Sequence, residues 1–229
     1  MKLTVFGSTG GVGQHVVAQV LEAGHAVTAF TRKPAMMTQS HPDLTVMRGD
    51  VLDPVAVQRA VAGQDVVICT LGMPLLNNDR LRTCGTANIV AAMEAVDVKR
   101  LVCLSSLGVS ESRALLPLLY KILIFPTVMK RLLVDHAGQE ALIAQSSLDW
   151  TVVRPGNFTR GERTGNYAHG FTTPDADLSF KISRSDVADF ILRQLSDDTY
   201  RNRAPALSYR KAGSRPVTRE TPVCAGDAR

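Results

Sequence analysis

Short apolar runs alternate with longer amphipathic stretches along the first hundred residues of this chain. The runs "LTVFG", "AVTAF", "LTVMRGD", "DVVICTLG" and "RLVCLSS" are rich in β-branched residues, and the stretches "GQHVVAQVLEAG" and "PVAVQRAVAG" repeat apolar residues at helical spacing. Strands that are apolar on both faces and separated by helices are typical of a parallel sheet covered on both sides. The pattern therefore predicts an α/β fold with a doubly wound parallel sheet.

A further helix is expected from about residue 79 to residue 96, where apolar and polar positions separate at helical spacing. The expected apolar stripe is Leu81, Ile89, Ala92 and Met93, and the positions expected to face elsewhere are Arg80, Arg82 and Glu94.

Beyond Ser106 the alternation loosens into a long apolar segment. A helix from about residue 128 to residue 145, the strand "LDWTVVRPG", a loop, the helix "SRSDVADFILRQLS" and a last strand in "APALSY" are expected to follow. No internal repeat and no linker divides the chain. We therefore expect a single domain over residues 1–209, with substrate-side elements at about 107–180, and a flexible basic tail over residues 210–229.

The composition is that of an ordinary globular protein. The 229 residues are 45% hydrophobic and 21% charged, enough to bury one substantial core. The net charge of +5 is scattered and aromatic residues make up only 5% of the chain, which argues against nucleic-acid binding. The most lipophilic stretch, residues 114–129, is interrupted by Pro117, Lys121 and Pro126 and is too short to cross a membrane.

The cysteines and the N-terminal sequence indicate whether the chain binds a metal and where in the cell it is expected. Cys69, Cys84, Cys103 and Cys224 are far apart and show none of the close pairings of metal or redox motifs, so we expect no metal site. Cys69 and Cys103 lie in apolar runs and are expected to be buried, reduced thiols. The strand-like opening "MKLTVFG" leaves no room for a signal peptide, and the expected location is cytoplasmic.

Four glycines fall within seven positions between the first predicted strand and the first predicted helix. Gly7 allows a tight turn, Gly10 and Gly11 let a pyrophosphate approach the backbone, and Gly13 lets the helix pack closely against the strand. The unpaired N–H groups at the helix N-terminus favour a phosphate charge. The spacing G-x-x-G-x-x-G in this context predicts a Rossmann-type dinucleotide site; the alternative is a turn that only lets the elements pack.

The end of the second predicted strand indicates which dinucleotide is bound. The segment "AVTAFTRKP" lacks the acidic residue that holds the adenosine ribose in NAD-binding sites. Arg32 and Lys33 stand where a 2′-phosphate would arrive, and a guanidinium fork suits a phosphate dianion. We therefore expect NADP(H) to be preferred over NAD(H); the alternative is that both side chains only face solvent.

The next strand ends carry further candidate contacts with the cofactor. Asp50, in "RGDV", could accept a hydrogen bond from the adenine amino group, and it could equally cap the following turn. "CTLGM" and "CLSSLG" end the fourth and fifth strands, beside the ribose and the nicotinamide. The residues expected at these three ends are Asp50, Val51, Leu71, Gly72, Met73, Ser105 and Ser106.

With these motifs in place, the chain resembles the atypical short-chain dehydrogenase/reductase superfamily, in its NAD(P)H-binding group with biliverdin reductase B/flavin reductase-like and NmrA-like proteins. The resemblance covers roughly residues 1–209 and is carried by "GSTGGVG", "TRKP", "GDV", "LSSLG", "SLDWTVVRPGNF" and "SRSDVADFIL". It implies phosphate contacts from the glycine-rich turn, a 2′-phosphate contact from Arg32, and a carboxamide contact from "RPGNF". The cofactor residues that it adds are Ser8, Thr9, Val12, Pro155, Gly156, Asn157 and Phe158.

One departure from the superfamily affects the expected chemistry. Its active dehydrogenases use a Tyr-x-x-x-Lys pair, and no tyrosine of this chain is followed by lysine at that spacing. The flavin reductase-like proteins also lack the pair and transfer hydride from a pre-positioned cofactor. "LLVDHAGQEALI" resembles their Asp-His segment, which makes His136, next to Asp135, the candidate proton donor, because an ordinary histidine pKa lies near operating pH. The alternative is an exposed helix residue without a catalytic part.

Three possible functions remain open. The first is an NADPH-dependent reductase of a flavin, quinone or similar conjugated molecule, with Ser106 and His136 as candidate catalytic residues and Leu115–Met129 as an apolar substrate wall. Ser106 could instead be a strand-end serine that bonds a local backbone group. The second is a non-catalytic NADP(H)-sensing regulator with a protein partner. A sugar-nucleotide epimerase or dehydratase is a third, for which the chain is short. A monomer or homodimer is expected.

Overall fold

The computed structural model describes residues 1–72, 80–117, 130–211 and 213. In this part of the chain, eight strands form one sheet in the order β3-β2-β1-β4-β5-β6-β10-β8, and all neighbours pair parallel except β8 with β10. The strands are β1 Lys2–Phe6, β2 Ala26–Thr31, β3 Leu44–Arg48, β4 Val66–Cys69, β5 Arg100–Leu104, β6 Asp149–Pro155, β8 Ala168–His169 and β10 Ala206–Ser208. The chain moves outward from β1 in one direction and then in the other, which confirms the doubly wound Rossmann fold.

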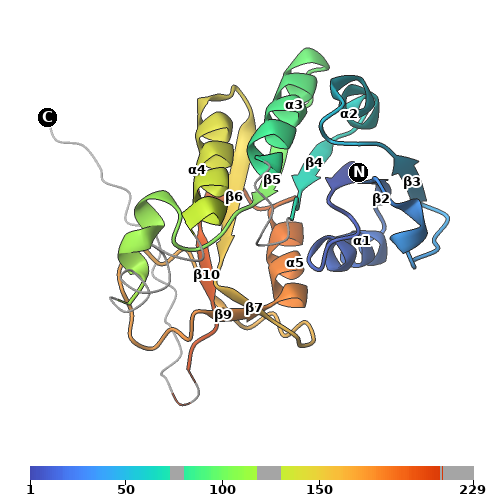
Figure 1. Cartoon of the computed structure of the whole chain (residues 1–229). Coiled ribbons are helices and arrows are strands. Elements are labelled where there is room, and N and C mark those ends of the chain that lie inside the picture. Colours follow the sequence, from blue (N-terminus) through green and yellow to red (C-terminus); the bar gives the residue numbers. More distant parts are fainter. Residues whose placement is uncertain (73–79, 118–129, 212, 214–229) are drawn as a thin grey trace, which may run out of the picture.

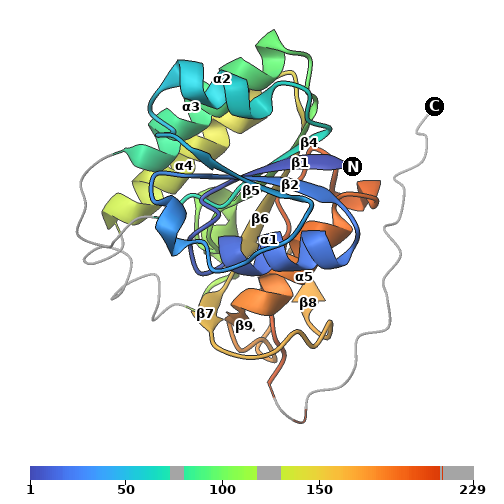
Figure 2. The same ribbon diagram turned by 90° about the vertical axis from the view of Figure 1, so that its right-hand side faces the viewer.

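Helices cover both faces of this sheet. Figure 2 shows α1 and α5 on one side of the strands and α2, α3 and α4 on the other. Their bounds are α1 Gly13–Glu22, α2 Pro54–Val61, α3 Leu81–Ala95, α4 Lys130–Gln145 and α5 Arg184–Arg193, with short 3-10 helices at Pro34–Met36, Ser110–Leu115 and Asp198–Tyr200. A small parallel pair, β7 Asn157–Thr159 and β9 Lys181–Ser183, lies beyond the sheet near α5 (Figure 1).

The first strand shows why the sheet needs both layers. Leu3 and Val5 are fully buried among the side chains of α1 and α5, whereas Phe6 is buried among those of α2 and α3. Thr4, on the same side as Phe6, is buried and donates a hydrogen bond to the carbonyl oxygen of Ala60 in α2. Alternate side chains of one strand thus enter two hydrophobic layers, as the apolar runs predicted.

Some expected elements differ in detail. The third strand was expected to be apolar on both faces, but β3 is an edge strand with Leu44 and Met47 half-buried and its other residues exposed. The expected loop between β6 and the last helix contains β7, β8 and β9. These strands have three residues or fewer, too few for the alternation of side chains to give a clear signal.

Arg82 corrects the expected pattern on α3. The side chains of the expected stripe are buried, and Arg80 and Glu94 are exposed, but Arg82 is buried between α3 and α4. Its guanidinium faces the Asp135 carboxylate of α4 at 3.4 Å. Asp135 also accepts hydrogen bonds from the backbone amides of Arg82 (3.2 Å) and Thr83 (3.0 Å), so a carboxylate of α4 caps the N-terminus of α3.

Three expectations fall outside the described residues. Met73, most of the apolar segment (residues 118–129) and the tail over residues 214–229 lie there. Of the cysteines, Cys69 and Cys103 are buried as expected, and Cys84 is exposed.

Candidate functional site

The glycine-rich turn connects β1 to α1 at the carboxyl edge of the sheet. Gly7 has a φ of +80°, and a Cβ there would lie 2.5 Å from the carbonyl oxygen of Thr70. A Cβ at Gly13 would collide with the Gly7 carbonyl oxygen, so these two glycines are required by the packing of the turn. The three atoms nearest to a Cβ at Gly11 would instead all belong to the side chain of Arg184.

Unpaired amides gather at the start of α1. The helix begins after Val12, whose side chain gives no cap. Within the described residues, no atom accepts a hydrogen bond from the backbone amides of Gly11, Val12 or Gly13. Three donors at the positive end of a helix form a site for an anion such as a phosphate.

Ser8 and Thr9 fix this turn rather than point out of it. Ser8 is buried and donates to the carbonyl oxygen of Phe30 at 3.1 Å, while the hydroxyls of Thr9 and Thr31 lie 3.5 Å apart. Both contacts tie the turn to β2. The two hydroxyls therefore help to hold the turn against β2.

At the end of β2, Arg32 and Lys33 are exposed. Arg32, with 62% of its side chain accessible, lies 4.0 Å from Asp50, the candidate adenine contact at the end of β3. Such a long, exposed pair contributes little stability, so the guanidinium can bind another anion.

Two different aspartates cap the turn after β3 and the helix α2. Asp50 Oδ1 accepts from the amide of Leu52 at 3.0 Å and so closes a turn, whereas the cap of α2 is Asp53. Val51 is buried and its carbonyl oxygen already accepts from the Asn88 side chain at 2.9 Å. Asp50 thus caps the turn that follows it, one of the two roles expected for it.

The ends of β4 and β6 contribute mainly backbone. Leu71 is buried, and Gly72 is exposed with no atom of the described residues within 4 Å of where a Cβ would be. Pro155 is buried, and a Cβ at Gly156 would lie 2.5 Å from the carbonyl oxygen of Phe180. Beyond it, Asn157 and Phe158 are exposed.

The two serines at the end of β5 have different surroundings. Ser106 is half-buried, and its hydroxyl donates only to the neighbouring Leu107 carbonyl oxygen at 3.3 Å. Ser105 is buried, donates to Glu140 Oε1 at 2.6 Å and lies 3.4 Å from His136 Nδ1. Ser106 is thus the serine whose hydroxyl has no strong partner in the described structure.

Ser105 belongs to a buried polar network that the sequence did not reveal. Glu140 and Arg154 form a two-pronged ion pair, with Arg154 Nε 3.0 Å from Oε1 and Nη2 2.7 Å from Oε2, and both side chains are more than nine-tenths buried. Arg154 Nη1 also donates to Glu111 at 2.6 Å. The available signals were an arginine inside the apolar strand "DWTVVRPG" and a glutamate four residues after His136.

The network borders a cavity of about 420 Å³ between α4, β6 and residues 202–204. Glu140, Arg154 and Trp150 line it, and none of the expected cofactor residues does. It is therefore separate from the glycine-rich turn.

His136 is buried rather than exposed. Burial, with the positive charge of Arg82 adding to it, lowers the pKa of His136 to about 3, so the imidazole is neutral at neutral pH. The expectation that its pKa lies near operating pH does not hold, because the ring is buried and desolvation disfavours its charged form.

This burial predicts an acid-sensitive fold. The unfolded chain takes up a proton on His136 below about pH 6.5, whereas the folded chain does so only near pH 3, so stability falls as the pH falls between these values. At about pH 4.5 the cost is roughly 2.5 kcal/mol. Urea unfolding of His136→Asn and of the unchanged chain at pH 7 and at pH 4.5 measures this. The free energy of unfolding should fall less with pH in the variant, and equal falls would contradict the prediction.

Within the described ranges, no helix combines the length and apolar character that a membrane crossing requires. Nor does this part of the chain bring together three or more side chains that could hold a metal ion.

Comparison with known proteins agrees with this geometry. The NAD(P)H-binding family matches over residues 7–198. The chloroplastic protein At2g34460 of Arabidopsis thaliana is 29% identical over 227 residues, covering 91% of this chain and 80% of that protein. The (4-alkanoyl-5-oxo-2,5-dihydrofuran-3-yl)methyl phosphate reductase of Streptomyces griseus is 26% identical over 214 residues, covering 90% and 67%.

Among solved structures, the fold is similar to that of ChuY, an anaerobilin reductase from Escherichia coli O157:H7. The TM-score is 0.76 at 21% identity, and the match covers 95% of this chain and 100% of ChuY. The structural likeness supports the fold, and the family match confirms the resemblance carried by the glycine-rich and strand-end motifs. Since that match spans most of the sequence, the chain belongs to the NAD(P)H-binding family of Rossmann-fold oxidoreductases.

Proposed function

We propose that this protein is an NADP(H)-dependent reductase that transfers hydride to a flavin, a quinone or a similar conjugated small molecule. The observation that carries the proposal is the set of unpaired amides at Gly11, Val12 and Gly13, with the exposed guanidinium of Arg32 at the neighbouring strand end. The relatives named above include reductases, one of them acting on a conjugated dihydrofuranone phosphate.

The described residues fit a dinucleotide. The amides would bind the pyrophosphate, Arg32 and Lys33 the 2′-phosphate, and the ends of β3 and β4 the adenosine. Ser106 would hydrogen-bond the nicotinamide or substrate, and residues 155–158 would lie on the carboxamide side. A bound reduced nicotinamide supplies the hydride. Because His136 is neutral and enclosed, we assign the proton to solvent and propose that His136 positions Ser105, next to Ser106.

Arg32→Ala is expected to weaken NADPH binding by about 10-fold to 100-fold and to leave NADH binding unchanged, since charge-assisted hydrogen bonds contribute about 1.5–3 kcal/mol. Isothermal titration with each cofactor measures this. Arg59→Ala, which removes an exposed arginine of α2, is the matched control. Equal losses for NADPH and NADH would remove the 2′-phosphate role.

Turnover tests the reaction itself. Purified protein with NADPH and a panel of flavins, quinones and tetrapyrroles is expected to consume the cofactor with at least one acceptor, measured by the loss of NADPH absorbance. Rates equal to those without enzyme for every acceptor would overturn the reductase proposal.

A second candidate is a non-catalytic NADP(H) sensor with a protein partner. The chain lacks the Tyr-x-x-x-Lys pair, and His136 is neutral. Both observations favour a sensor, because they leave no evident proton donor at the site. A sensor is expected to bind NADP⁺ and NADPH without consuming either. Both proposals include a cytoplasmic location and a monomeric or homodimeric state. Neither includes binding to nucleic acid or to a membrane.

A further inference from the structure

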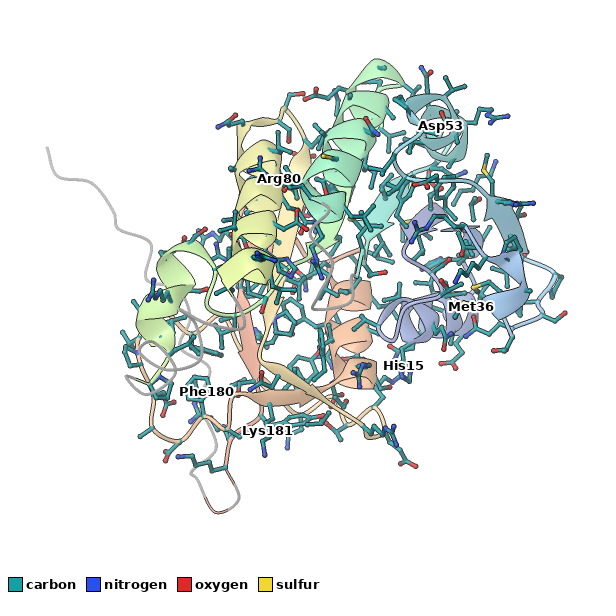
Figure 3. The ribbon with its side chains drawn as sticks, in the orientation of Figure 1. His15, Met36, Asp53, Arg80, Phe180 and Lys181 are labelled. Atoms are coloured by element: carbon teal, nitrogen blue, oxygen red, sulfur yellow. The ribbon has the colours of Figure 1, made fainter. Side chains whose placement is uncertain are left out.

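The N-terminus of α5 lies beside α1 and is held there. Ser183 caps the helix by accepting from the amide of Asp186 at 3.0 Å. Gln19, in α1, donates to the carbonyl oxygen of Ser185 at 2.9 Å. Figure 1 shows the two helices side by side, and in Figure 3 the labels His15 and Lys181 mark the first turn of α1 and the strand that leads into α5. The backbone of Arg184, the first residue of α5, is therefore fixed near the glycine-rich turn.

The side chain of Arg184 reaches that turn. A Cβ placed on Gly11 would lie 2.8 Å from Arg184 Nε and 2.9 Å from its Cδ. The guanidinium carbon lies 5.4 Å from the centre of the Phe158 ring, and Nη1 donates to the Thr159 carbonyl oxygen at a long 3.4 Å. Arg184 thus lies between the glycine-rich turn and the segment that follows β6.

These contacts leave the charge of Arg184 without a carboxylate partner among the described residues. Asp186, the acid in the first turn of α5, is occupied by Thr164, Gly165 and Tyr209. A cation in the first turn of a helix is also disfavoured by the positive end of the helix dipole. A half-buried guanidinium in this position is stabilised when an anion joins it.

We propose that Arg184 binds the pyrophosphate of the dinucleotide from the side opposite the amides of α1. This inference rests on the proposed NADP(H) binding. The guanidinium presents a planar set of N–H donors that matches two phosphate oxygens. Gly11 has no side chain, so it leaves room for the Arg184 side chain beside the turn. Arg184 serves NADH and NADPH alike, since both carry the pyrophosphate, whereas Arg32 serves only the 2′-phosphorylated form.

Three ligands separate the two arginines by isothermal titration: NADPH, NADH and adenosine 2′-monophosphate, which carries the 2′-phosphate but no pyrophosphate. Arg184→Gln is expected to weaken NADPH and NADH by the same factor, about 10-fold to 100-fold, and to leave adenosine 2′-monophosphate unchanged. Arg32→Ala is expected to weaken NADPH and adenosine 2′-monophosphate and to spare NADH. Arg184→Lys, which keeps the charge but not the fork, should recover part of the lost affinity.

Arg193→Gln, on the same helix and paired with Asp189, is the matched control and should bind all three ligands normally. If the unchanged protein binds neither NADPH nor NADH at millimolar concentration, the proposed function itself fails. If it binds them and Arg184→Gln binds them equally well, the role of Arg184 is overturned. Loss of adenosine 2′-monophosphate binding in Arg184→Gln, or no recovery in Arg184→Lys, would also overturn it, because the effect would then be structural.

Discussion

Gly13→Ala is expected to destabilise the fold by about 3 kcal/mol or more and to abolish cofactor binding. The added Cβ would collide with the carbonyl oxygen of Gly7 and would lie 2.9 Å from Thr70 Oγ1, and a backbone oxygen in a turn this tight cannot move aside without shifting α1 from β1. Alanine has the higher helix propensity by about 1 kcal/mol, which is too little to offset the collision. A shifted α1 also moves the amides proposed to bind the pyrophosphate.

Urea unfolding measures the stability change, and titration with NADPH measures binding. For stability, Gly72→Ala is the matched control, because no atom of the described residues lies within 4 Å of a Cβ at Gly72, and its stability is expected to stay within about 0.5 kcal/mol. If Gly13→Ala were as stable as Gly72→Ala, the close packing of α1 against the turn would not be required by the fold.

The sheet and its layers could be predicted because their signals are local. Each parallel strand is a run of consecutive apolar residues, and each helix repeats its apolar positions within the same short window. The glycine-rich turn shows itself in the same way, since its four glycines lie within seven positions, although Gly7 is also required by Thr70, a distant residue just after β4. Short strands such as β8 and β9 carry no such signal.

The remaining features depend on contacts between distant parts of the chain. Asp135 looked like the companion of a catalytic histidine, but it caps α3 and pairs with Arg82, 53 positions away. Arg184 lies at Gly11 only because α5 packs against α1. The residue type of His136 suggested a proton donor, whereas its protonation depends on burial, which a single sequence does not give.

Arg154→Ala is expected to cost about 3–5 kcal/mol of stability. The substitution leaves the buried carboxylate of Glu140 without its two guanidinium hydrogen bonds, with the hydroxyls of Ser105 and Ser110 as its remaining partners among the described residues. A buried pair adds little net stability, but breaking one side of it exposes the full desolvation cost of the other. Glu140, the acceptor of the Ser105 hydroxyl, would no longer be held in place by Arg154, which would disturb the strand end that carries Ser106.

Unfolding in urea distinguishes this cost from the loss of an arginine in general. Arg201→Ala, which removes exposed pairs with Asp149 and Asp198, is the control and should cost less than about 1 kcal/mol. Glu140→Gln added to Arg154→Met removes the unpaired charge and is expected to restore most of the stability, since the two sites are coupled. Equal losses for Arg154→Ala and Arg201→Ala would mean that solvent reaches Glu140, and the network would then not hold Ser105 in place.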